Sequence, residues 1–600
     1  IVMIMMKLDE YFTAEKIIKY LCRIRAKHAK QRSKKHSIHV LTENEGFNYH
    51  INIDKNKEKI SAQEKQLNQI LPSRRKWKKL NKKNRYNKNS QKINSVEYNA
   101  LSLRITINYY KKNHPKEPFL LKLNDFISEI KNAINNPHYK IAPPAIYPKL
   151  KGVKKKKNNE CRPISLYSLK DKIIISLINK YFTKIFDDYF YKFSFAFRAT
   201  KRIEDRIINP SHHDAIQVIL NYKKLYKGKH LWVSECDIRK FYDSVNHTII
   251  KKHFKKLINK VNKNTPDLYD ERAERIFYSY LDSYTFVKNV LPKNDDPEYW
   301  EGEERSIPDG RFKWVDDDLL KLNHYRDIKN AKIGIPQGGA ISGLIANIVL
   351  GYADNLVMKS KISKLLYIRF CDDMIMIHPF KRECLKAMNI YDNALIKLKL
   401  IPHDFSKNLQ NTSDSFWSKD VKSKSPYKWS SDFINTFPWF GFVGYEIHYD
   451  GLLRIRKSSL KKEIDKQTEV VNNILSAVRK GRRKSDPYIL NSAINRLIGM
   501  SVGRLELWNF DKTDNEMCWV NGFSKLSDND NKYLRIQLKL LDRNRNKMVA
   551  ILKREIEKIE FAPIKNSGDE EPPTKSPKFD FYGKPFSYYY QVIEKGNDLM

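Results

Sequence analysis

Two adjacent carboxylates, Asp372 and Asp373, stand between two short apolar runs within Leu365–Ile377. Apolar, partly β-branched runs on both sides of a polar pair are typical of a β-hairpin, so we expect both carboxylates at its turn. Two such charges at the end of buried strands repel each other unless cations neutralise them. Mg²⁺ suits that task because it prefers carboxylate oxygens and keeps waters for phosphate oxygens. An acidic pair in an ordinary turn is the alternative interpretation.

A third carboxylate, Asp237, stands where an apolar segment that begins at Trp232 gives way to a helical pattern reaching His253. This order predicts a strand, a turn and a helix, with the acid at the end of the strand. An acid in that place can join the hairpin pair to bind two metal ions, and such a site clamps the attacking and leaving oxygens of a phosphoryl transfer. For Asp237 alone, an N-terminal helix cap is the competing interpretation.

Two glycines, Gly338 and Gly339, precede an apolar helical stretch within Ile333–Asn347. Glycine removes the side chain where a backbone must approach another group closely. Taken alone, a Gly-Gly pair before a helix is only a weak signal for a phosphate-binding loop.

The chain has 600 residues and a formal net charge of +44, and this excess of positive charge suggests a partner with dense negative charge. Nucleic acid is the first candidate, and an anionic membrane surface is the alternative, although no apolar run is long enough to span a bilayer. The six cysteines include no Cys-x-x-Cys pair. Zinc ribbons and disulfide frameworks are therefore disfavoured, and a reducing cytoplasm fits.

A basic run occupies residues 74–92, which contain ten Lys or Arg and no acid, with Trp77 and Tyr86 interleaved. Such a run can neutralise phosphates while its aromatic rings stack on unpaired bases. A solvated basic linker is the alternative. The residues that we expect to bind nucleic acid here are Arg74, Arg75, Lys76, Trp77, Lys78, Lys79, Lys82, Lys83 and Arg85.

The segments around Asp237, Gly338 and Asp372, in this order, resemble motifs A, B and C of reverse transcriptases, specifically the bacterial branch with the group II intron and retron enzymes. Phe370 and Cys371 depart from the usual Tyr and Ala before the acidic pair, but neither change removes a metal ligand. Flanking segments also resemble family motifs: Tyr147–Lys149, Arg162–Ser165 and Ser194–Arg198 those of the fingers, Leu398–Lys407 motif D, and Phe442–Ile447 the primer grip.

The resemblance implies a role for each matching residue. Asp237, Asp372 and Asp373 would hold two Mg²⁺ ions with help from the Ile238 carbonyl, and Lys407 would act as a general acid near the leaving pyrophosphate. Tyr242 would be the steric gate that excludes a ribose 2′-OH, with a packed core aromatic as the alternative. By the same resemblance, Gln337 and Gly338 would contact the template and the incoming base pair, and Gly339 and Ser342 would contact nucleic acid. Arg162 and Arg198 would contact triphosphate or template, with surface ion pairing as the alternative for these two arginines.

The implied fold is an α+β right-hand polymerase, with fingers and palm followed by a mainly helical thumb or C-terminal region. A segment at about 262–330 separates motifs A and B widely, and its loop-like, locally acidic character suggests an insertion. We expect five parts: a basic N-terminal extension (1–140), fingers (141–230), a palm containing the insertion (231–450), a helical thumb-like region (451–560) and an aromatic, Pro-rich tail (561–600).

Accessory signatures narrow the class of reverse transcriptase. No HNH-like His/Cys cluster follows residue 450, no Val-Thr-Gly triplet marks a retron, and no RNase H or protease segment is recognisable. The chain therefore resembles the unknown-group and abortive-infection enzymes of bacteria, many of which act in antiphage defence with a noncoding RNA. A group II intron-like or retron-like enzyme, a non-catalytic RNA-binding maturase and an RNA polymerase are the alternatives.

The expected partners are an RNA template, a DNA product and dNTPs, with no membrane and with a homo-oligomer or an accessory protein left open. We expect the protein to lie in the bacterial cytoplasm.

Overall fold

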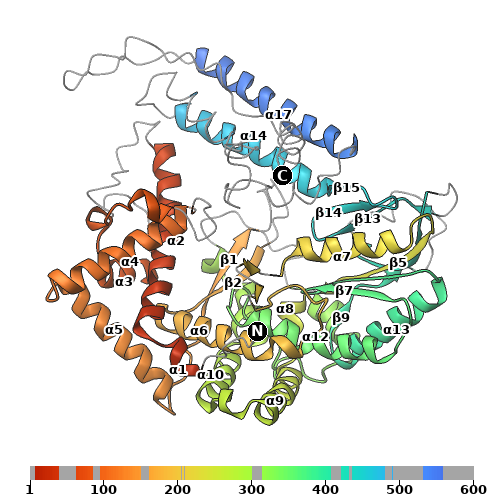
Figure 1. The fold of residues 1–600 in the computed structure, drawn as a ribbon, viewed down its shortest axis with the longest axis horizontal. Helices are drawn as coiled ribbons and strands as arrows, with labels where there is room; N and C mark the ends of the chain where they lie inside the picture. The colour runs from red at the N-terminus through yellow and green to blue at the C-terminus, as the bar shows by residue number, and fades with distance from the viewer. Residues whose placement is uncertain are drawn as a thin grey trace. The chain divides into compact units, whose positions relative to one another are not determined.

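The structure is a computed structural model, drawn in Figure 1, and the chain divides into two compact units. Unit 1 comprises Ile1–Ile17, Asp125–Val443 and His448–Gly451, and unit 2 comprises Ile18–Asn124, Gly444–Ile447 and Leu452–Met600. The structure describes residues 7–39, 62–85, 93, 95–150, 161–199, 201–203, 206–208, 210–300, 312, 314–406, 421–431, 436–479, 490, 497 and 532–558.

The centre of unit 1 is a β-sheet whose strands come from distant parts of the chain. Its strand order is β10 (Phe405–Ser406), β11 (Ser423–Trp429), β5 (Leu231–Cys236), β8 (Asp373–His378) and β7 (Leu366–Phe370), with β12 (Thr436–Phe437) paired to β11. β5 runs antiparallel to both β8 and β11, and β7 and β8 form an antiparallel hairpin. The hairpin predicted around the acidic pair is therefore present.

Helices cover this sheet on both faces. α13 (Lys381–Lys397) packs against β5, β8 and β11, and α7 (His212–Leu225) packs against β7. Figure 1 shows α7 and α13 on either side of the strands. This double cover explains why β8 is buried at every position from Met374 to His378 and reads as a continuous apolar run instead of an alternating one.

A helical layer in unit 1 packs around aromatic side chains. It contains α6 (Leu169–Phe186), α9 (His247–Asn264), α10 (Glu271–Asp282) and α12 (Ser342–Lys359). Phe254 of α9 stacks on Phe277 of α10 with ring centroids 3.8 Å apart, and Phe182 of α6 meets both rings edge-on. Such aromatic contacts add about 0.5–1.5 kcal/mol per pair beyond the burial of apolar area.

The position of α10 corrects one expectation. The sequence around 262–330 looked loop-like because of its charged and polar residues, but Glu271–Asp282 forms a helix. Ile276, Phe277 and Leu281 are buried on one face, and Asp270 caps the N-terminus by accepting a hydrogen bond from the Arg272 amide. This part of the segment belongs to the core of unit 1.

Smaller elements complete unit 1. β1 (Ala145–Leu150) and β2 (Cys161–Leu166) form an antiparallel pair that precedes α6. The remaining described elements are α1 (Leu8–Tyr11), η3 (Asp187–Tyr189), β3 (Lys201–Ile203), β4 (Arg206–Ile208), β6 (Ile238–Arg239), α8 (Phe241–Ser244), η4 (Pro266–Leu268), η5 (Phe286–Val290), η6 (Leu291–Asp295), α11 (Pro297–Trp300), η7 (Val315–Leu320), β9 (Ile401–Pro402) and β13 (Trp439–Phe442).

Unit 2 is mainly helical. α14 (Lys457–Arg479) and α17 (Lys532–Glu557) pack through a cluster that includes Val471, Ile474 and Leu552. β14 (Tyr445–His448) pairs with β15 (Leu453–Ile455). The helices near the N-terminus are α2 (Ala14–His39) and α5 (Pro118–Asn135), which span the unit boundary, and α3 (Ala62–Ile70), η1 (Arg74–Lys76), η2 (Lys82–Arg85) and α4 (Ser95–Asn113).

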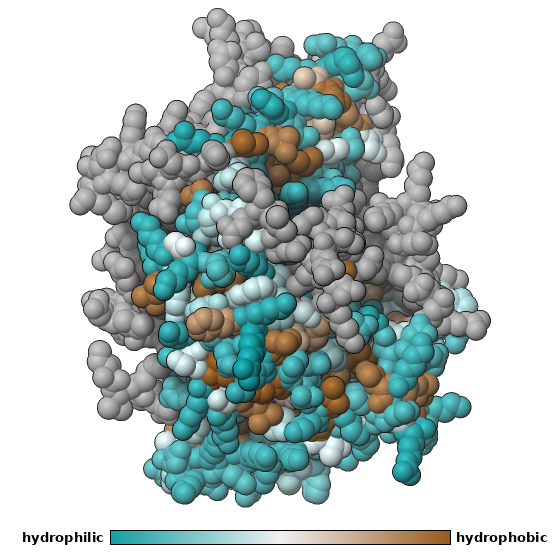
Figure 2. All heavy atoms as spheres, turned by 90° about the vertical axis from the view of Figure 1, so that its right-hand side faces the viewer, coloured by the Kyte–Doolittle hydropathy of each residue, from teal (hydrophilic) through white to brown (hydrophobic). Residues whose placement is uncertain are grey.

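On the face drawn in Figure 2, hydrophilic side chains predominate among the coloured residues, with smaller groups of hydrophobic ones between them. None of the helices in the described part of the chain combines the length and the apolarity needed to cross a bilayer.

Candidate active site

The acidic pair lies at one end of the central sheet. Phe370 of β7 pairs with Asp373 of β8, so Cys371 and Asp372 form a two-residue turn between them. Cys371 has a φ of 59°, the left-handed conformation that such a turn requires and that residues other than glycine adopt at some cost. Asp372 is partly exposed and Asp373 is exposed, so both carboxylates are accessible from solvent.

The register of β5 brings the third carboxylate to the same end. Cys236 pairs with Met374 across β5 and β8, and one further step along the two strands places Asp237 level with Asp373. The Asp237 amide donates to Ser423 Oγ (3.2 Å), and the Asp237 carbonyl accepts from the His403 amide (3.0 Å). The backbone of Asp237 is therefore fixed between β11 and the segment that follows β9, and Ile238 pairs with Pro402.

The Asp237 side chain faces two basic groups that sequence reasoning missed. Its Oδ2 lies 3.6 Å from Lys422 Nζ and 3.6 Å from His403 Nε2. Burial, and next the Lys422 charge, lower the pKa of His403 to about 4. His403 is therefore neutral at pH 7, and Lys422 is the cation that faces this carboxylate.

The donor set fits Mg²⁺ by its chemistry and by its backbone placement. Three carboxylates at one end of a sheet supply the hard oxygen ligands that Mg²⁺ prefers. Within the described residues, however, no group of three or more His, Cys, Asp or Glu side chains has converged closely enough to hold a metal ion. The Asp237 carboxylate, turned toward Lys422, would have to rotate toward Asp372 and Asp373 to complete such a site.

Tyr242 lies beside the acidic turn. It belongs to the short helix α8, and its hydroxyl is 3.4 Å from Cys371 Sγ. The side chain is only partly buried, yet burial raises the pKa of its phenol well above the usual value, so the hydroxyl is neutral. A bulky, uncharged ring thus stands next to the residues predicted to hold the metal ions.

Gln337 is held by hydrogen bonds from its side chain and from its backbone. The side-chain Nε2 donates to Asp243 Oδ1 (2.9 Å), and the backbone carbonyl accepts from the Ser165 amide of β2 (2.9 Å). Gly338 has a φ of 90°, and a Cβ there would lie 3.3 Å from Ile164 Cγ2. Burial raises the pKa of Asp243, opposed by the Gln337 bond and by the charges of Lys240 and Arg162. Arg162, exposed on β2, therefore lies within the electrostatic reach of this cluster.

Ser342 is buried and Gly339 is partly buried. The Ser342 Oγ donates a hydrogen bond to the Pro336 carbonyl (2.7 Å) and lies 2.9 Å from Tyr280 Oη. A Cβ on Gly339 would lie 2.1 Å from Tyr280 Oη. Gly339 thus lets the loop before α12 pack against Tyr280, and the Ser342 side chain bonds within the protein and is not presented to solvent.

Arg198 forms a buried ion pair with Asp187. Its Nε is 2.8 Å from Asp187 Oδ1, its Nη1 donates to the carbonyls of Tyr191 and Ser194, and both side chains are about 5% exposed or less. Of the two interpretations drawn from the sequence, this geometry favours ion pairing over contact with triphosphate or template. Lys407 lies outside the described residues.

In its described part, the basic run near the N-terminus has a backbone that is hydrogen-bonded to a neighbouring helix. The Lys78 amide donates to Thr106 Oγ1 (2.8 Å), and the Lys78 carbonyl accepts from Ser102 Oγ (2.5 Å), so this backbone is bonded to α4. Lys78 Nζ lies 3.7 Å from the ring centroid of Tyr109 on α4. The side chains of Arg74, Arg75, Lys76, Lys78 and Lys79 are exposed.

Several side chains of the run also bond to the protein. Trp77 Nε1 donates to the Pro72 carbonyl, Arg85 Nε donates to the Leu80 carbonyl, and the exposed Lys76 pairs with Glu117. The side chains of Lys82 and Lys83, and all of Tyr86, lie outside the described residues.

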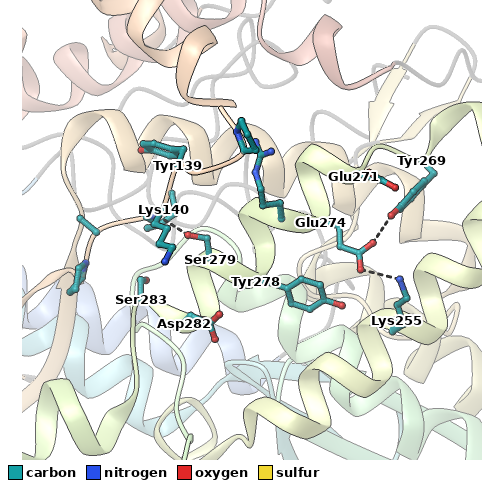
Figure 3. A pocket seen from close by; sticks show the side chains of 15 residues that line it. Tyr139, Lys140, Lys255, Tyr269, Glu271, Glu274, Tyr278, Ser279, Asp282 and Ser283 are labelled. Atoms are coloured by element: carbon teal, nitrogen blue, oxygen red, sulfur yellow. Dashed lines mark hydrogen bonds and ion pairs between the residues drawn. The ribbon is translucent and has the colours of Figure 1, made fainter. Parts of the chain in front are cut away.

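A cavity of about 820 Å³ lies elsewhere in unit 1, between the segment 137–143 and α10. Figure 3 shows Lys255 and Tyr269 converging on Glu274, and the Ile141 amide donates to Ser279 Oγ (2.7 Å). None of the residues predicted from the sequence to bind metal, nucleotide or nucleic acid lines this cavity. Cavity size therefore does not locate the candidate site.

The packing around Gly339 gives a stability prediction. Gly339→Ala should lower the free energy of unfolding by about 1–3 kcal/mol, because the new methyl group overlaps Tyr280 Oη and the loop must shift. Gly351→Ala is the matched control: a Cβ there meets nothing within 4 Å, and alanine in a helix interior should stabilise by about 0.5–1 kcal/mol. Urea unfolding of the three proteins measures both effects, and equal midpoints for wild type and Gly339→Ala would show that the loop is free to move.

Comparison with known proteins supplies the family of this region. Residues 153–404 match the family described as reverse transcriptase (RNA-dependent DNA polymerase). No curated protein matches the chain. Among solved structures, the chain is similar to telomerase from Candida albicans in complex with a fragment of telomeric RNA, with 10% identity over 78% of this chain and 76% of that one and a TM-score of 0.30. Apo telomerase from Candida tropicalis is similar with 14% identity over 72% and 73% of the two chains and a TM-score of 0.30.

The matched region contains Asp237, Tyr242, Gln337, Asp372 and Asp373. The predicted α+β polymerase fold, with a central sheet and a helical region after it, is confirmed. Residues 153–404 therefore form a reverse transcriptase domain, whose enzymatic activity is RNA-directed DNA synthesis, a nucleotidyltransferase reaction.

Proposed function

We propose that this chain copies an RNA template by adding dNTPs to a primer, with Asp237, Asp372 and Asp373 as the residues that hold two Mg²⁺ ions. The supporting observation is the pairing of β5, β8 and β7, which brings these three carboxylates to one end of one sheet within the matched region. When bound, the two ions supply the charge that activates a primer 3′-OH and neutralises the phosphates. The Ile238 carbonyl is the further ligand in this proposal.

The surrounding residues position the substrates. The Tyr242 ring, next to Cys371, closes the space that a ribose 2′-OH would need. Gln337, held by Asp243 and by the Ser165 amide, presents a fixed backbone to the template and the incoming base pair. Arg162 is exposed on β2 and directs its positive charge to the triphosphate. In this proposal Lys407 protonates the leaving pyrophosphate.

Loss of the acidic pair should abolish DNA synthesis. The paired variant Asp372→Asn/Asp373→Asn keeps the size of both side chains and removes both charges, so Mg²⁺ loses its main ligands. We expect incorporation of labelled dNTPs on a primed RNA template to fall by about 10³-fold or more, as is usual when two groups of one catalytic unit are removed. Circular dichroism and melting temperature would check that the variant is folded.

The same assay separates the alternatives. RNase treatment before the assay should remove activity if RNA is the template. A folded wild-type protein that retains RNA but incorporates no nucleotide would instead favour the non-catalytic, RNA-binding maturase.

The Tyr242 ring should set sugar selectivity. Tyr242→Ala opens space for the 2′-OH and should raise the ratio of kcat/KM for CTP over dCTP by about tenfold or more, since each 1.4 kcal/mol of lost discrimination is a tenfold change. Tyr242→Phe is the matched control, because it keeps the ring and removes only the hydroxyl that contacts Cys371. An unchanged ratio in Tyr242→Ala, with the expected incorporation of dCTP, would assign Tyr242 to packing alone.

We also propose that the exposed basic surface formed by Arg74, Arg75, Lys76, Lys78 and Lys79 binds RNA. Two features support this surface over a solvated linker: its backbone is bonded to α4 through Thr106 and Ser102, and Lys78 lies over Tyr109, whose side chain is 38% exposed. An ordered set of cations loses less conformational entropy on binding than a flexible one. Tyr109 adds a ring on which a base can stack.

Neutralising this surface should weaken RNA binding in a salt-dependent way. Lys78→Ala/Lys79→Ala should lower the slope of log affinity against log salt concentration by about 1–2, as expected for one or two lost phosphate contacts. Lys252→Ala/Lys256→Ala removes the same charge from exposed positions of α9 and is the matched control. Fluorescence anisotropy with a labelled single-stranded RNA at several salt concentrations measures both. Equal slopes in the two variants would reject the surface.

We further propose that the protein acts in antiphage defence in the bacterial cytoplasm and that a noncoding RNA supplies the template. The support is the sequence resemblance to bacterial defence enzymes. Expression of the wild-type protein in bacteria should lower phage plaque counts. Expression of the Asp372→Asn/Asp373→Asn variant should leave plaque counts equal to those on cells that carry the empty vector. Sequencing of the co-purified RNA and of the DNA product would identify the template.

A further inference from the structure

Arg369, a residue of β7, is fully buried in an otherwise apolar strand. Its side chain is 0% exposed and forms a two-pronged ion pair with Asp354 of α12, Nε to Oδ1 at 2.9 Å and Nη2 to Oδ2 at 2.7 Å. Its remaining nitrogen, Nη1, donates to Asn347 Oδ1 (3.2 Å) and to the Cys371 carbonyl (2.8 Å). Every nitrogen of the guanidinium group therefore has an acceptor.

The groups around Arg369 form one buried polar network. Asp354 also accepts from the Tyr367 hydroxyl (2.5 Å), and Asn347 Oδ1 also accepts from Ser194 Oγ (3.1 Å). Ser194, Asn347 and Asp354 are buried residues, each 0–1% exposed. A polar network of this kind is rigid when all its members are satisfied, and it fixes the elements that carry them.

The bond to Cys371 connects this network to the acidic turn. Cys371 holds the left-handed conformation, with φ at 59°, and its carbonyl belongs to the peptide group that leads into Asp372. The guanidinium bond fixes the orientation of that peptide plane. Because Asp372 and Asp373 follow at once, their directions depend on it.

We propose that Arg369 is the positioning residue of the metal site: through the Cys371 carbonyl it fixes the peptide that aims the Asp372 and Asp373 carboxylates. The inference rests on the proposed function, since it concerns how the same carboxylates are oriented. A stabilising role alone does not account for the geometry, because a buried ion pair is commonly no more stable than an apolar pair of similar volume. The structure instead connects this ion pair, through the Arg369–Cys371 hydrogen bond, to the turn that orients Asp372 and Asp373.

A double substitution separates positioning from stability. Arg369→Met/Asp354→Leu replaces the ion pair by apolar side chains of comparable size, so the fold should persist while the Cys371 carbonyl loses its donor. The matched control is Arg198→Met/Asp187→Leu, which makes the same exchange at a second buried pair, whose arginine donates to the Tyr191 and Ser194 carbonyls instead of to the acidic turn. Arg369→Lys, which keeps the charge with a different donor geometry, is the second variant.

Mn²⁺ binding, followed by electron paramagnetic resonance, is the main readout because it does not require turnover. We expect the Arg369→Met/Asp354→Leu protein to bind Mn²⁺ about tenfold more weakly than wild type, the size typical for losing a group that orients metal ligands. Its Mg²⁺ requirement for DNA synthesis should rise in parallel, with the KM for dNTP changed less than kcat. The Arg198→Met/Asp187→Leu protein should bind Mn²⁺ as wild type does.

The outcomes are distinguishable. Wild-type Mn²⁺ affinity in a folded Arg369→Met/Asp354→Leu protein would overturn the positioning role and leave the proposed function intact. If that double variant does not fold, the Mn²⁺ affinity of Arg369→Lys is compared with that of the wild type instead, and an unchanged affinity would overturn the positioning role. Equal weakening in both double variants would also overturn the inference, because it would show a general effect of core changes. If the wild type binds no Mn²⁺ and so does not differ from the Asp372→Asn/Asp373→Asn variant, the proposed function itself is overturned.

Discussion

Three negative charges at one end of one sheet are the constraint on which the rest of unit 1 depends. Carboxylates such as those of Asp237, Asp372 and Asp373 repel one another, and the pairing of β5 with β8 and of β8 with β7 nevertheless brings the residues that carry them to the same end of the sheet. Side chains alternate along a strand, so a slip of one residue in either pairing would turn a carboxylate to the opposite face. Continuous burial of β8 between α7 and α13 makes such a slip costly because it would disturb packing on both faces. The apolar core thus enforces an arrangement that electrostatics alone opposes.

The loop before α12 shows a second way in which packing fixes the site. Its polar groups bond inward, Gln337 to Asp243 and Ser342 to the Pro336 carbonyl. At Gly339, Tyr280 leaves no room for a side chain. The loop is therefore held as a surface of backbone with few mobile parts.

Local patterns in the sequence predicted what depends on local structure. The hairpin around Asp372 and the strand that ends at Asp237 follow from short-range apolar patterns, and both are present. Contacts made by distant segments were not predictable: Lys422 reaches Asp237 only through the pairing of β11 with β5, and no spacing in the sequence links Arg369 with Asp354. Arg198 and α10 show the converse. The resemblance implied a triphosphate or template contact for Arg198, and the stretch that contains α10 looked loop-like. In the structure Arg198 forms a buried ion pair, and Glu271–Asp282 is an amphipathic helix.

The backbone of Arg369 has a consequence of a different kind. β7 is the last strand in its sheet, and outer strands offer unsatisfied amide and carbonyl groups to which other chains can add and aggregate. Here the Arg369 amide donates to the Phe193 carbonyl (3.1 Å), and the Arg369 carbonyl accepts from the Phe195 amide (3.0 Å). The segment Phe193–Phe195 therefore shields this edge at its midpoint. During synthesis on the ribosome that segment emerges well before β7, so the shield is already available when the strand that needs it appears.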